Sequence, residues 1–194
     1  MYKVLNGDKF SKLWMDIIEF RGAFGLPCNQ PNNDNTELHI ELLREELIEG
    51  FSSTERALQI DGIIDSAYVV MGYFVENSLT YETLKMQHPY LLGLLDTFLC
   101  AAENLKFNFF DAWGIVHRSN LSKICTLANV GLTLDFYREL GISAAADPVH
   151  SEHTVGEALF IVKVKETTVL GDKTFPSGKV LKCIEYMEAD LSRL

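Results

Sequence analysis

Cysteine is scarce in this sequence, and its four cysteines show no metal-binding spacing. Cys28, Cys100, Cys125 and Cys183 are scattered along 194 residues without a CxxC motif. A zinc site or a disulfide framework would need cysteines in close or regularly spaced pairs. We therefore expect four reduced thiols, as in proteins of the cytoplasm.

The chain also has few positively charged residues. The chain has 17 Lys and Arg residues against 27 Asp and Glu residues, a formal net charge of −10, and no basic run. Its isoelectric point is about 4.9. Proteins that bind nucleic-acid polymers or anionic membranes present basic surfaces, so neither partner is expected. A single nucleotide is compatible with this charge, because a metal ion can neutralise its phosphates.

Long apolar runs, internal repeats and low-complexity tracts are missing too. No uncharged apolar run reaches 18 residues, and the N-terminal MYKVLNGDKF has no apolar signal-peptide region. Neither a membrane span nor a secretory signal is therefore expected. Hydrophobic residues nevertheless make up 47% of the chain, enough for a packed core. The length fits a single domain, residues 1–194, with room for an insertion.

Helical periodicity accounts for most of the chain, and the pattern of a strand appears near its end. The apolar spacing predicts helices over residues 8–22, 36–50, 55–78, 90–105 and 127–140, and a shorter helix that begins at Asn108. Residues 144–157 lack periodicity and predict a mobile loop. The alternating run ALFIVKVKETTVL predicts a strand, followed by turns at Gly171-Asp172 and at 176–178. The expected fold is mainly α, an antiparallel helical bundle with a small β-hairpin or three-stranded appendage near the C-terminus.

The run ELLREELIEG places Glu45, Glu46 and Glu49 in the second predicted helix. At about 100° per residue, Glu46 falls inside the apolar arc of that helix and Glu49 falls beside it. Residues three apart are neighbours on a helix surface, so these two glutamates could share one ion. The ordinary explanation of such a run, a solvated charged face, fits Glu45 better than the other two.

The next predicted helix carries Asp61 and Asp65 in the run QIDGIIDSAYVVMG. It is apolar nearly all round, which is typical of a buried helix. Two aspartates four residues apart repel each other there unless a cation lies between them. The short connection 50–54 makes the two helices antiparallel neighbours, so their acids could face each other. We therefore predict a hard divalent cation, Mg²⁺, held by these carboxylates.

An ordered series of sequence blocks resembles the all-α nucleoside triphosphate pyrophosphohydrolases. This superfamily comprises MazG-like and phosphoribosyl-ATP pyrophosphohydrolase-like proteins, and the closest resemblance is to its stand-alone phage and bacterial forms. The blocks are EFRGAFGLP, EELIE, DGIID, VHRSNLSK and SGKVLKCIEYMEADL. A lone EExxE is weak, because many surface helices contain it, but the ordered series is specific. Gly62 departs from the pattern, since many members carry glutamate there, and Asp61 would then supply that carboxylate.

The resemblance implies a helical catalytic core at 8–125, completed by a C-terminal tail at 176–194 and interrupted by an insertion at 126–175 of unassigned role. It implies a Mg²⁺-dependent hydrolase, with Mn²⁺ as a substitute metal, acting in control of the nucleotide pool. Its reaction would convert a nucleoside or deoxynucleoside triphosphate and water to the monophosphate and pyrophosphate. The implied location is the cytoplasm, or the host cytoplasm if a phage encodes the chain. Members of the family are dimers or tetramers, so a homodimer or homotetramer is expected.

The acidic residues take two roles under this resemblance. A Mg²⁺ ion bridging protein and phosphate oxygens would be held by Glu46, Glu49, Asp61 and Asp65. A carboxylate at the edge of the cluster would take the proton of the attacking water. Glu49 is the first candidate for this base, and Glu45 is the second.

Substrate contacts are expected from cationic, amide and aromatic side chains. The candidates are Arg118, Asn120 and Lys123 in VHRSNLSK, Lys179 and Lys182 in the tail, and Phe24 for the base. Surface cations near a helix C-terminus explain Arg118 and Lys123 equally well, because the helix dipole favours them there. Among the histidines, His117 is expected to be structural, and the pair His150 and His153 is not expected to bind a transition metal.

Two functions of other classes remain open at the level of sequence. The first is a non-catalytic nucleotide-binding or regulatory protein of the same fold that has lost one acid, as Gly62 suggests. The second is a structural helical oligomerisation module. Buried carboxylates that repel one another would destabilise such a module, so neutralising them would stabilise it.

Overall fold

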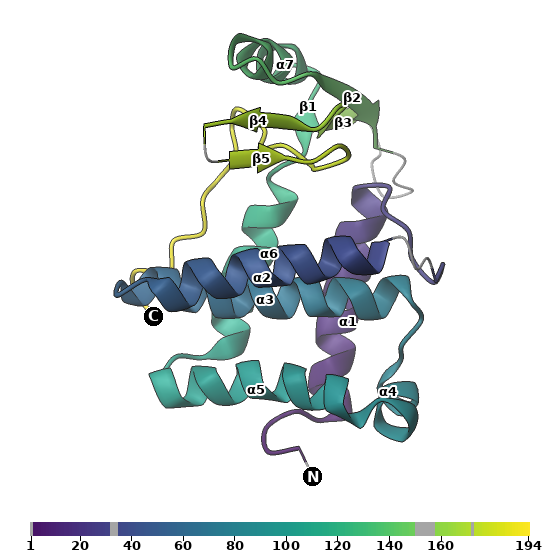
Figure 1. Ribbon diagram of the computed structural model, residues 1–194, viewed down its shortest axis with the longest axis vertical. Coiled ribbons are helices and arrows are strands. Elements are labelled where there is room, and N and C mark those ends of the chain that lie inside the picture. Colours follow the sequence, from purple (N-terminus) through teal and green to yellow (C-terminus); the bar gives the residue numbers. More distant parts are fainter. Residues whose placement is uncertain (1, 32–34, 150–157, 172) are drawn as a thin grey trace. The chain divides into compact units, whose positions relative to one another are not determined.

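The computed structural model describes residues 2–31, 35–149, 158–171 and 173–194. The fold is mainly helical, with small antiparallel sheets in the C-terminal third (Figure 1), so the predicted fold class is confirmed. The described chain separates into two compact units. The first comprises Met1–Gly22, Leu26–His117 and Ala189–Leu194, and the second comprises Ala23–Gly25 and Arg118–Glu188.

The first unit is built from helices whose bounds lie close to the predicted ones. They are α1 (Gly7–Ala23), α2 (Thr36–Ser52), α3 (Arg56–Glu76), α4 (Tyr81–Gln87), α5 (Pro89–Leu105) and α6 (Phe109–Leu121), and the last residues of α6 belong to the second unit. Only α4 was not predicted, because it spans just two turns. Its sequence signal is Thr80, whose hydroxyl accepts a hydrogen bond from the backbone N–H of Thr83 at 3.3 Å.

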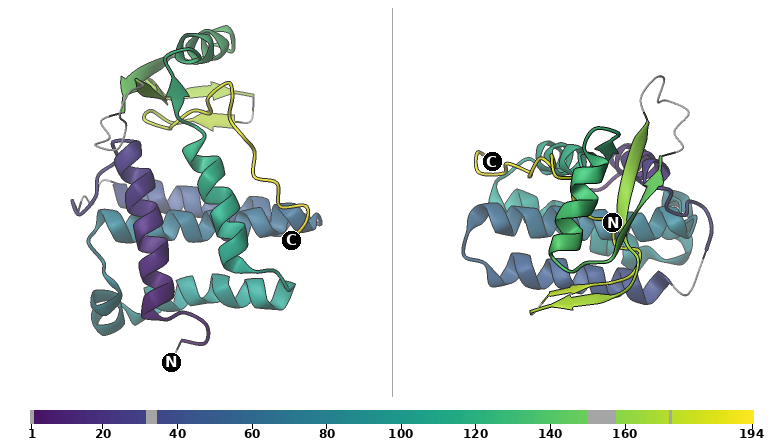
Figure 2. Two further views of the ribbon diagram at one scale, coloured as in Figure 1. Left: turned by 180° about the vertical axis from the view of Figure 1, so that it is seen from behind. Right: turned by 90° about the horizontal axis from the view of Figure 1, so that it is seen from above.

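Helix α3 is the centre of the first unit. Its apolar side chains Ile60, Ile63, Ala67, Val70 and Phe74 are all buried, as expected of a helix that is apolar nearly all round. In the view from behind, α1 and the first turns of α6 run across the α2–α3 pair (Figure 2). Among the described helices α3 alone has the length and composition of a membrane span, and 67% of its apolar window is buried inside the protein. That burial is typical of a core helix.

Helices α2 and α3 run antiparallel and side by side, as their short connection predicted (Figure 1). Their closest approach is at Gly50 and Gly62. A Cβ atom built on Gly62 would lie 2.5 Å from the Cα of Gly50 and 3.0 Å from the backbone oxygen of Glu46. Because real Cβ contacts are not that short, glycine at position 62 is required by the packing of the two helices.

The other end of the helix pair is joined by a buried ionic network. Glu76, at the end of α3, lies 2.8 Å from Arg21 of α1 and 2.8 Å from His39 of α2. Asn35 donates a further hydrogen bond to Glu76 at 2.6 Å. Burial alone would raise the pKa of Glu76, but these partners together outweigh it and hold the pKa below its ordinary value. The network therefore keeps a buried carboxylate ionised and ties three helices together.

The second unit packs one helix and a hairpin around a small sheet. The sheet has the antiparallel order β1 (Cys125–Thr126), β3 (Leu159–Val164), β2 (Ala144–Pro148), with Ala146 opposite Val162. The hairpin pairs β4 (Thr168–Leu170) with β5 (Lys173–Phe175), and the helix is α7 (Val130–Glu139). The core of the unit contains Cys125, Tyr137, Ile142, Val162, Val164, Leu181 and Cys183.

The predicted loop at 144–157 is partly wrong, because its first residues form β2. The stretch Ala144–Pro148 has no alternating pattern, and it becomes a strand by pairing with β3 along its whole length. Residues 150–157 of that predicted loop, which include His150 and His153, lie outside the described residues. The same holds for Asp172 of the predicted turn. The four cysteines are free thiols, as predicted.

Candidate functional site

The predicted metal-binding acids lie on facing helices but differ in burial. Glu46 of α2 and Asp61 and Asp65 of α3 are half-buried, whereas Glu45 and Glu49 are exposed. The backbone of Glu46 lies against the α3 turn that contains Gly62, next to Asp61. Asp65 is one turn further along α3 and is therefore a surface neighbour of Asp61. The close packing at Gly50 and Gly62 thus brings the acid-bearing turns of both helices together.

Glu49 is exposed, although the sequence placed it beside the apolar arc of α2, which was expected to be buried. Helix α2 packs against α3 along one side only, and Gly50 is its only buried residue. Leu38 and Ile40, which lie on the apolar arc of the predicted helix, are also exposed, and so is Ile48. The arc read from the sequence is therefore wider than the surface that α3 covers.

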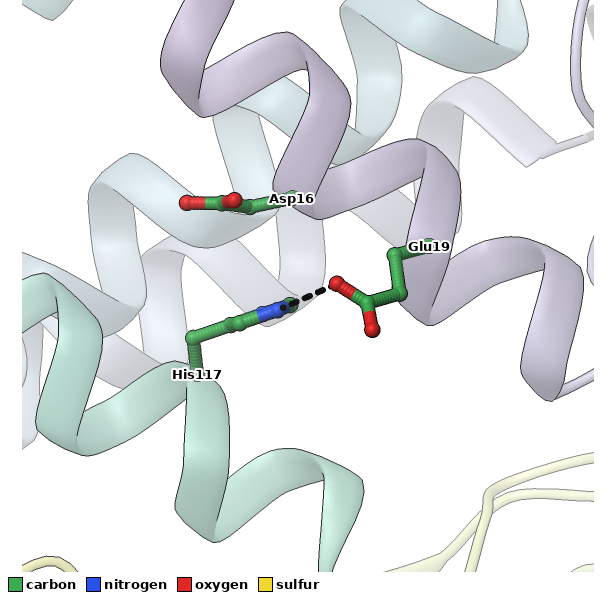
Figure 3. Close-up of side chains that lie close together, drawn as sticks. All are labelled: Asp16, Glu19 and His117. Atoms are coloured by element: carbon green, nitrogen blue, oxygen red, sulfur yellow. Dashed lines mark hydrogen bonds and ion pairs between the residues drawn. The ribbon is translucent and has the colours of Figure 1, made fainter. Parts of the chain in front are cut away.

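A second group of ligand-type side chains, which the sequence had not indicated, lies between α1 and α6. Asp16 and Glu19 of α1 and His117 of α6 each bring one ligand atom within 4.8 Å of the others (Figure 3). His117 Nε2 lies 3.3 Å from Glu19 Oε2. No other group of three or more such residues meets this distance within the described residues, so the α2 and α3 acids do not form one in this structure.

The group is held in place by two buried aromatic side chains. The Trp113 indole N–H donates to Asp16 Oδ2 at 2.8 Å, and the Tyr68 hydroxyl lies 3.0 Å from His117 Nδ1. Burial raises the pKa of Tyr68 far above its ordinary value, and the charges of nearby carboxylates, Asp16, Asp65 and Glu19, raise it further. Tyr68 therefore stays protonated, and its hydroxyl remains a hydrogen-bonding partner of the His117 ring.

The sequence signal for this group was present but weak. Asp16 and Glu19 are three residues apart in the helix predicted over residues 8–22, so they could be recognised as surface neighbours. His117 was expected to be structural, and the structure does give a buried ring with hydrogen-bonding partners on both nitrogens. The contact between residues about one hundred positions apart in the chain could come only from tertiary packing.

The predicted phosphate-binding residues lie in the second unit. Arg118 is exposed at the end of α6, and Asn120 is buried and accepts a hydrogen bond from Lys123. Lys179 lies over the Phe175 ring, and Lys182 lies 4.3 Å from the centroid of Tyr186 and 3.7 Å from Glu188. Asn120 and Lys123 of the motif VHRSNLSK are thus in contact, as residues three apart in a helical turn can be.

The proposed base contact is not accessible in this structure. The Phe24 side chain is 0% exposed, so its ring offers no free face for stacking on a nucleobase. Phe24 had been chosen because an aromatic side chain beside Gly25 in a loop could reach a nucleobase. Burial of the ring explains the difference, because an aromatic side chain gains most when its whole surface leaves water.

A pocket of about 220 Å³ opens elsewhere in the first unit, among α2, α3 and α5. Its wall is mostly apolar and includes Leu43, Val70, Tyr73 and Leu94, with no carboxylate among the lining residues. A cleft of this kind suits an apolar or aromatic group rather than phosphates. It is therefore separate from both acidic groups.

No protein-family model, curated protein or solved structure was found to match this chain. Support for a function comes from the chemistry of the residues and from their geometry.

Proposed function

We propose that the protein is a Mg²⁺-dependent nucleoside triphosphate pyrophosphohydrolase, which releases pyrophosphate and a nucleoside monophosphate. The observation that carries the proposal is the antiparallel packing of α2 against α3 at Gly50 and Gly62. It juxtaposes the half-buried Glu46 with the turn that bears Asp61 and Asp65. Half-buried carboxylates on two facing helices are an oxygen-rich environment of the kind that binds Mg²⁺.

The chemistry requires such an ion because the protein is strongly acidic. A triphosphate carries several negative charges, and a chain of net charge −10 repels it unless a cation bridges the two. Mg²⁺ held by these carboxylates would bind phosphate oxygens and orient the attacking water at the α-phosphorus. Glu49 and Glu45, both exposed on α2, would then be in reach of solvent water as bases, with Glu49 preferred.

Arg118, Asn120 and Lys123, which lie in the second unit, remain predicted phosphate contacts that are argued separately from the metal site. Arg118 is exposed and free of any salt bridge to the described residues, so its guanidinium is open to a bidentate contact with phosphate. Lys123 would act as a point charge from the same motif.

The experiment measures pyrophosphate release from each of the eight common nucleoside and deoxynucleoside triphosphates with Mg²⁺ or Mn²⁺. We expect at least one to be hydrolysed, and Glu46→Gln and Asp65→Asn each to lower kcat/KM by about 10²-fold or more. Glu41→Gln, which neutralises an exposed acid on the same helix α2, is the matched control and should leave the rate unchanged. Nucleotide binding without turnover under either metal would contradict the proposal and favour a regulatory protein.

The packing at Gly62 bears on that regulatory alternative. The regulatory alternative was suggested by Gly62, which stands where many members of the superfamily carry glutamate. In this structure no side chain fits at position 62 beside Gly50. The glycine therefore has a structural reason of its own, and it is no sign of a lost catalytic residue.

A further inference from the structure

We propose that Asp16, Glu19 and His117 form a binding site for a divalent transition-metal ion such as Zn²⁺, separate from the Mg²⁺ ion proposed between α2 and α3. The three side chains supply two carboxylate oxygens and one imidazole nitrogen within 4.8 Å of one another (Figure 3). Asp16 and Glu19 are neighbours on one face of α1, and His117 approaches them from α6. One ion between them could bind all three.

The ligand types favour a transition metal over Mg²⁺. Imidazole nitrogen together with carboxylate oxygen suits Zn²⁺, Co²⁺ and Mn²⁺, whereas Mg²⁺ prefers oxygen ligands and water throughout. Three protein ligands with a further position open to water are also the pattern of catalytic zinc sites. The Glu19 side chain is 63% exposed and that of His117 only 10%, so an ion could enter from the Glu19 side and keep water there.

The surroundings of the group resemble the support that metal ligands receive from their neighbours. A metal-bound histidine usually uses its second ring nitrogen in a hydrogen bond that fixes the ring. His117 Nδ1 lies 3.0 Å from the buried Tyr68 hydroxyl, while Nε2 faces the carboxylates. The tyrosine hydroxyl can accept from Nδ1–H and so leave Nε2 free for an ion. Asp16 is oriented in the same manner by the Trp113 indole N–H at 2.8 Å.

The negative charge of Asp16 and Glu19 also favours binding of a cation at this group. No Lys or Arg among the described residues forms a salt bridge with Asp16 or Glu19. The His117 imidazole lies 3.3 Å from Glu19. Two carboxylates without a Lys or Arg partner among the described residues create a negative potential beside His117 that favours a divalent ion.

The test uses the full chain, freed of metal and titrated with Co²⁺, whose visible absorption reports its ligands. Every protein tested carries the substitutions His150→Gln and His153→Gln, so that these two histidines do not contribute to Co²⁺ binding. We expect one Co²⁺ per chain, displaced by an equivalent of Zn²⁺ and retained in millimolar Mg²⁺. Glu19→Gln and His117→Gln should each weaken binding at least tenfold.

Matched variants separate binding at this site from binding elsewhere on the chain. His88→Gln, a partly buried histidine elsewhere in the first unit, should leave the Co²⁺ affinity unchanged. Because Glu19 is exposed, Glu19→Gln should keep the fold, which thermal unfolding checks. Unchanged Co²⁺ binding in Glu19→Gln, loss of the spectrum in Asp65→Asn alone, or no Co²⁺ binding at all would overturn the proposal. These readouts need no enzymatic activity, so they hold whether or not the proposed hydrolase activity is found.

Discussion

Asp96 shows how one buried charge fixes a segment that apolar packing does not. Its carboxylate accepts hydrogen bonds from the backbone N–H groups of Lys3 at 2.7 Å, Val4 at 2.9 Å and Leu5 at 2.7 Å. Burial alone would raise the pKa of Asp96, but these three donors outweigh it and hold the pKa below its ordinary value of 3.8. The first residues of the chain are therefore tied to α5 by an ionised side chain.

Replacing Asp96 by asparagine should lower the free energy of unfolding by about 1–3 kcal/mol at neutral pH. The asparagine side chain has one oxygen and one NH₂ group, so at least one of the three backbone N–H groups would face another donor and lose its acceptor. Since the folded pKa lies below the unfolded one, this stabilisation is present above the unfolded value and is lost as the pH falls through the folded value. Asp96→Asn should therefore show a flatter decline of stability in acid. Urea unfolding at a series of pH values from neutral to acidic measures both the loss of stability at neutral pH and the decline of stability in acid.

The control for this prediction is Glu103→Gln, which neutralises an exposed carboxylate on the same helix α5. It should leave both the neutral stability and the acid decline close to those of the original chain. An Asp96→Asn variant as stable as this control would show that the three backbone hydrogen bonds contribute little.

The pair α2 and α3 is the element on which the proposed function depends, and its geometry is set by two glycines. Glycine usually costs helix stability, since it adds backbone entropy to the unfolded chain. Here the cost is offset because the two backbones pack within contact distance at Gly50 and Gly62. This close approach is also what brings the backbone of Glu46 against the α3 turn beside Asp61.

Gly62→Ala should lower the free energy of unfolding by about 1–3 kcal/mol, because the added methyl group meets the backbone of α2. Gly93→Ala in α5 is the matched control. Nothing lies within 4 Å of a Cβ atom at Gly93, so alanine should raise stability by roughly 0.5–1 kcal/mol through helix propensity. Chemical denaturation of both variants measures the contrast, and equal effects of the two substitutions would contradict backbone contact at Gly62.

At the scale of the whole molecule, an exposed apolar surface on the outer side of α2 bears on the predicted homo-oligomer. A shallow surface there is lined by Ile40, Leu43, Arg44, Leu47, Ile48 and Phe51. These residues recur at helical spacing, and Ile40, Ile48 and Phe51 are 61%, 54% and 72% exposed. A continuous apolar stripe on a helix is covered in most stable proteins. The expected homodimer or homotetramer would cover it with α2 of another chain.

Light scattering on purified protein at micromolar concentration should give the mass of two or four chains of 21.9 kDa. Ile40→Lys combined with Ile48→Lys should shift the mass to that of a single chain, because lysine disfavours an apolar interface. Met86→Lys, at a side chain of α4 that is 80% exposed, should not. A single-chain mass for the unaltered protein would contradict the prediction of an oligomer.

Much of this arrangement could be predicted, for physical reasons that are visible at particular residues. The periodicity of α3 determined that Ile60, Ile63 and Ala67 are buried, and the short connection to α2 determined that the two helices are antiparallel. The strand β2 could not be predicted, since Ala144–Pro148 has no pattern of its own and acquires strand structure from β3. The burial of Phe24 was missed because loop composition does not show where a ring will pack.

The sequence by itself determined the longer helices, the buried side of α3 and the acids that mark α2 and α3, because these follow from local spacing along one chain. Tertiary structure alone decided which distant side chains meet. Asp16, Glu19 and His117 come together because α1 and α6 both pack across the α2–α3 pair, and Gly62 is required because two backbones touch there. Contacts of this kind depend on how helices are placed against one another, which no local pattern specifies.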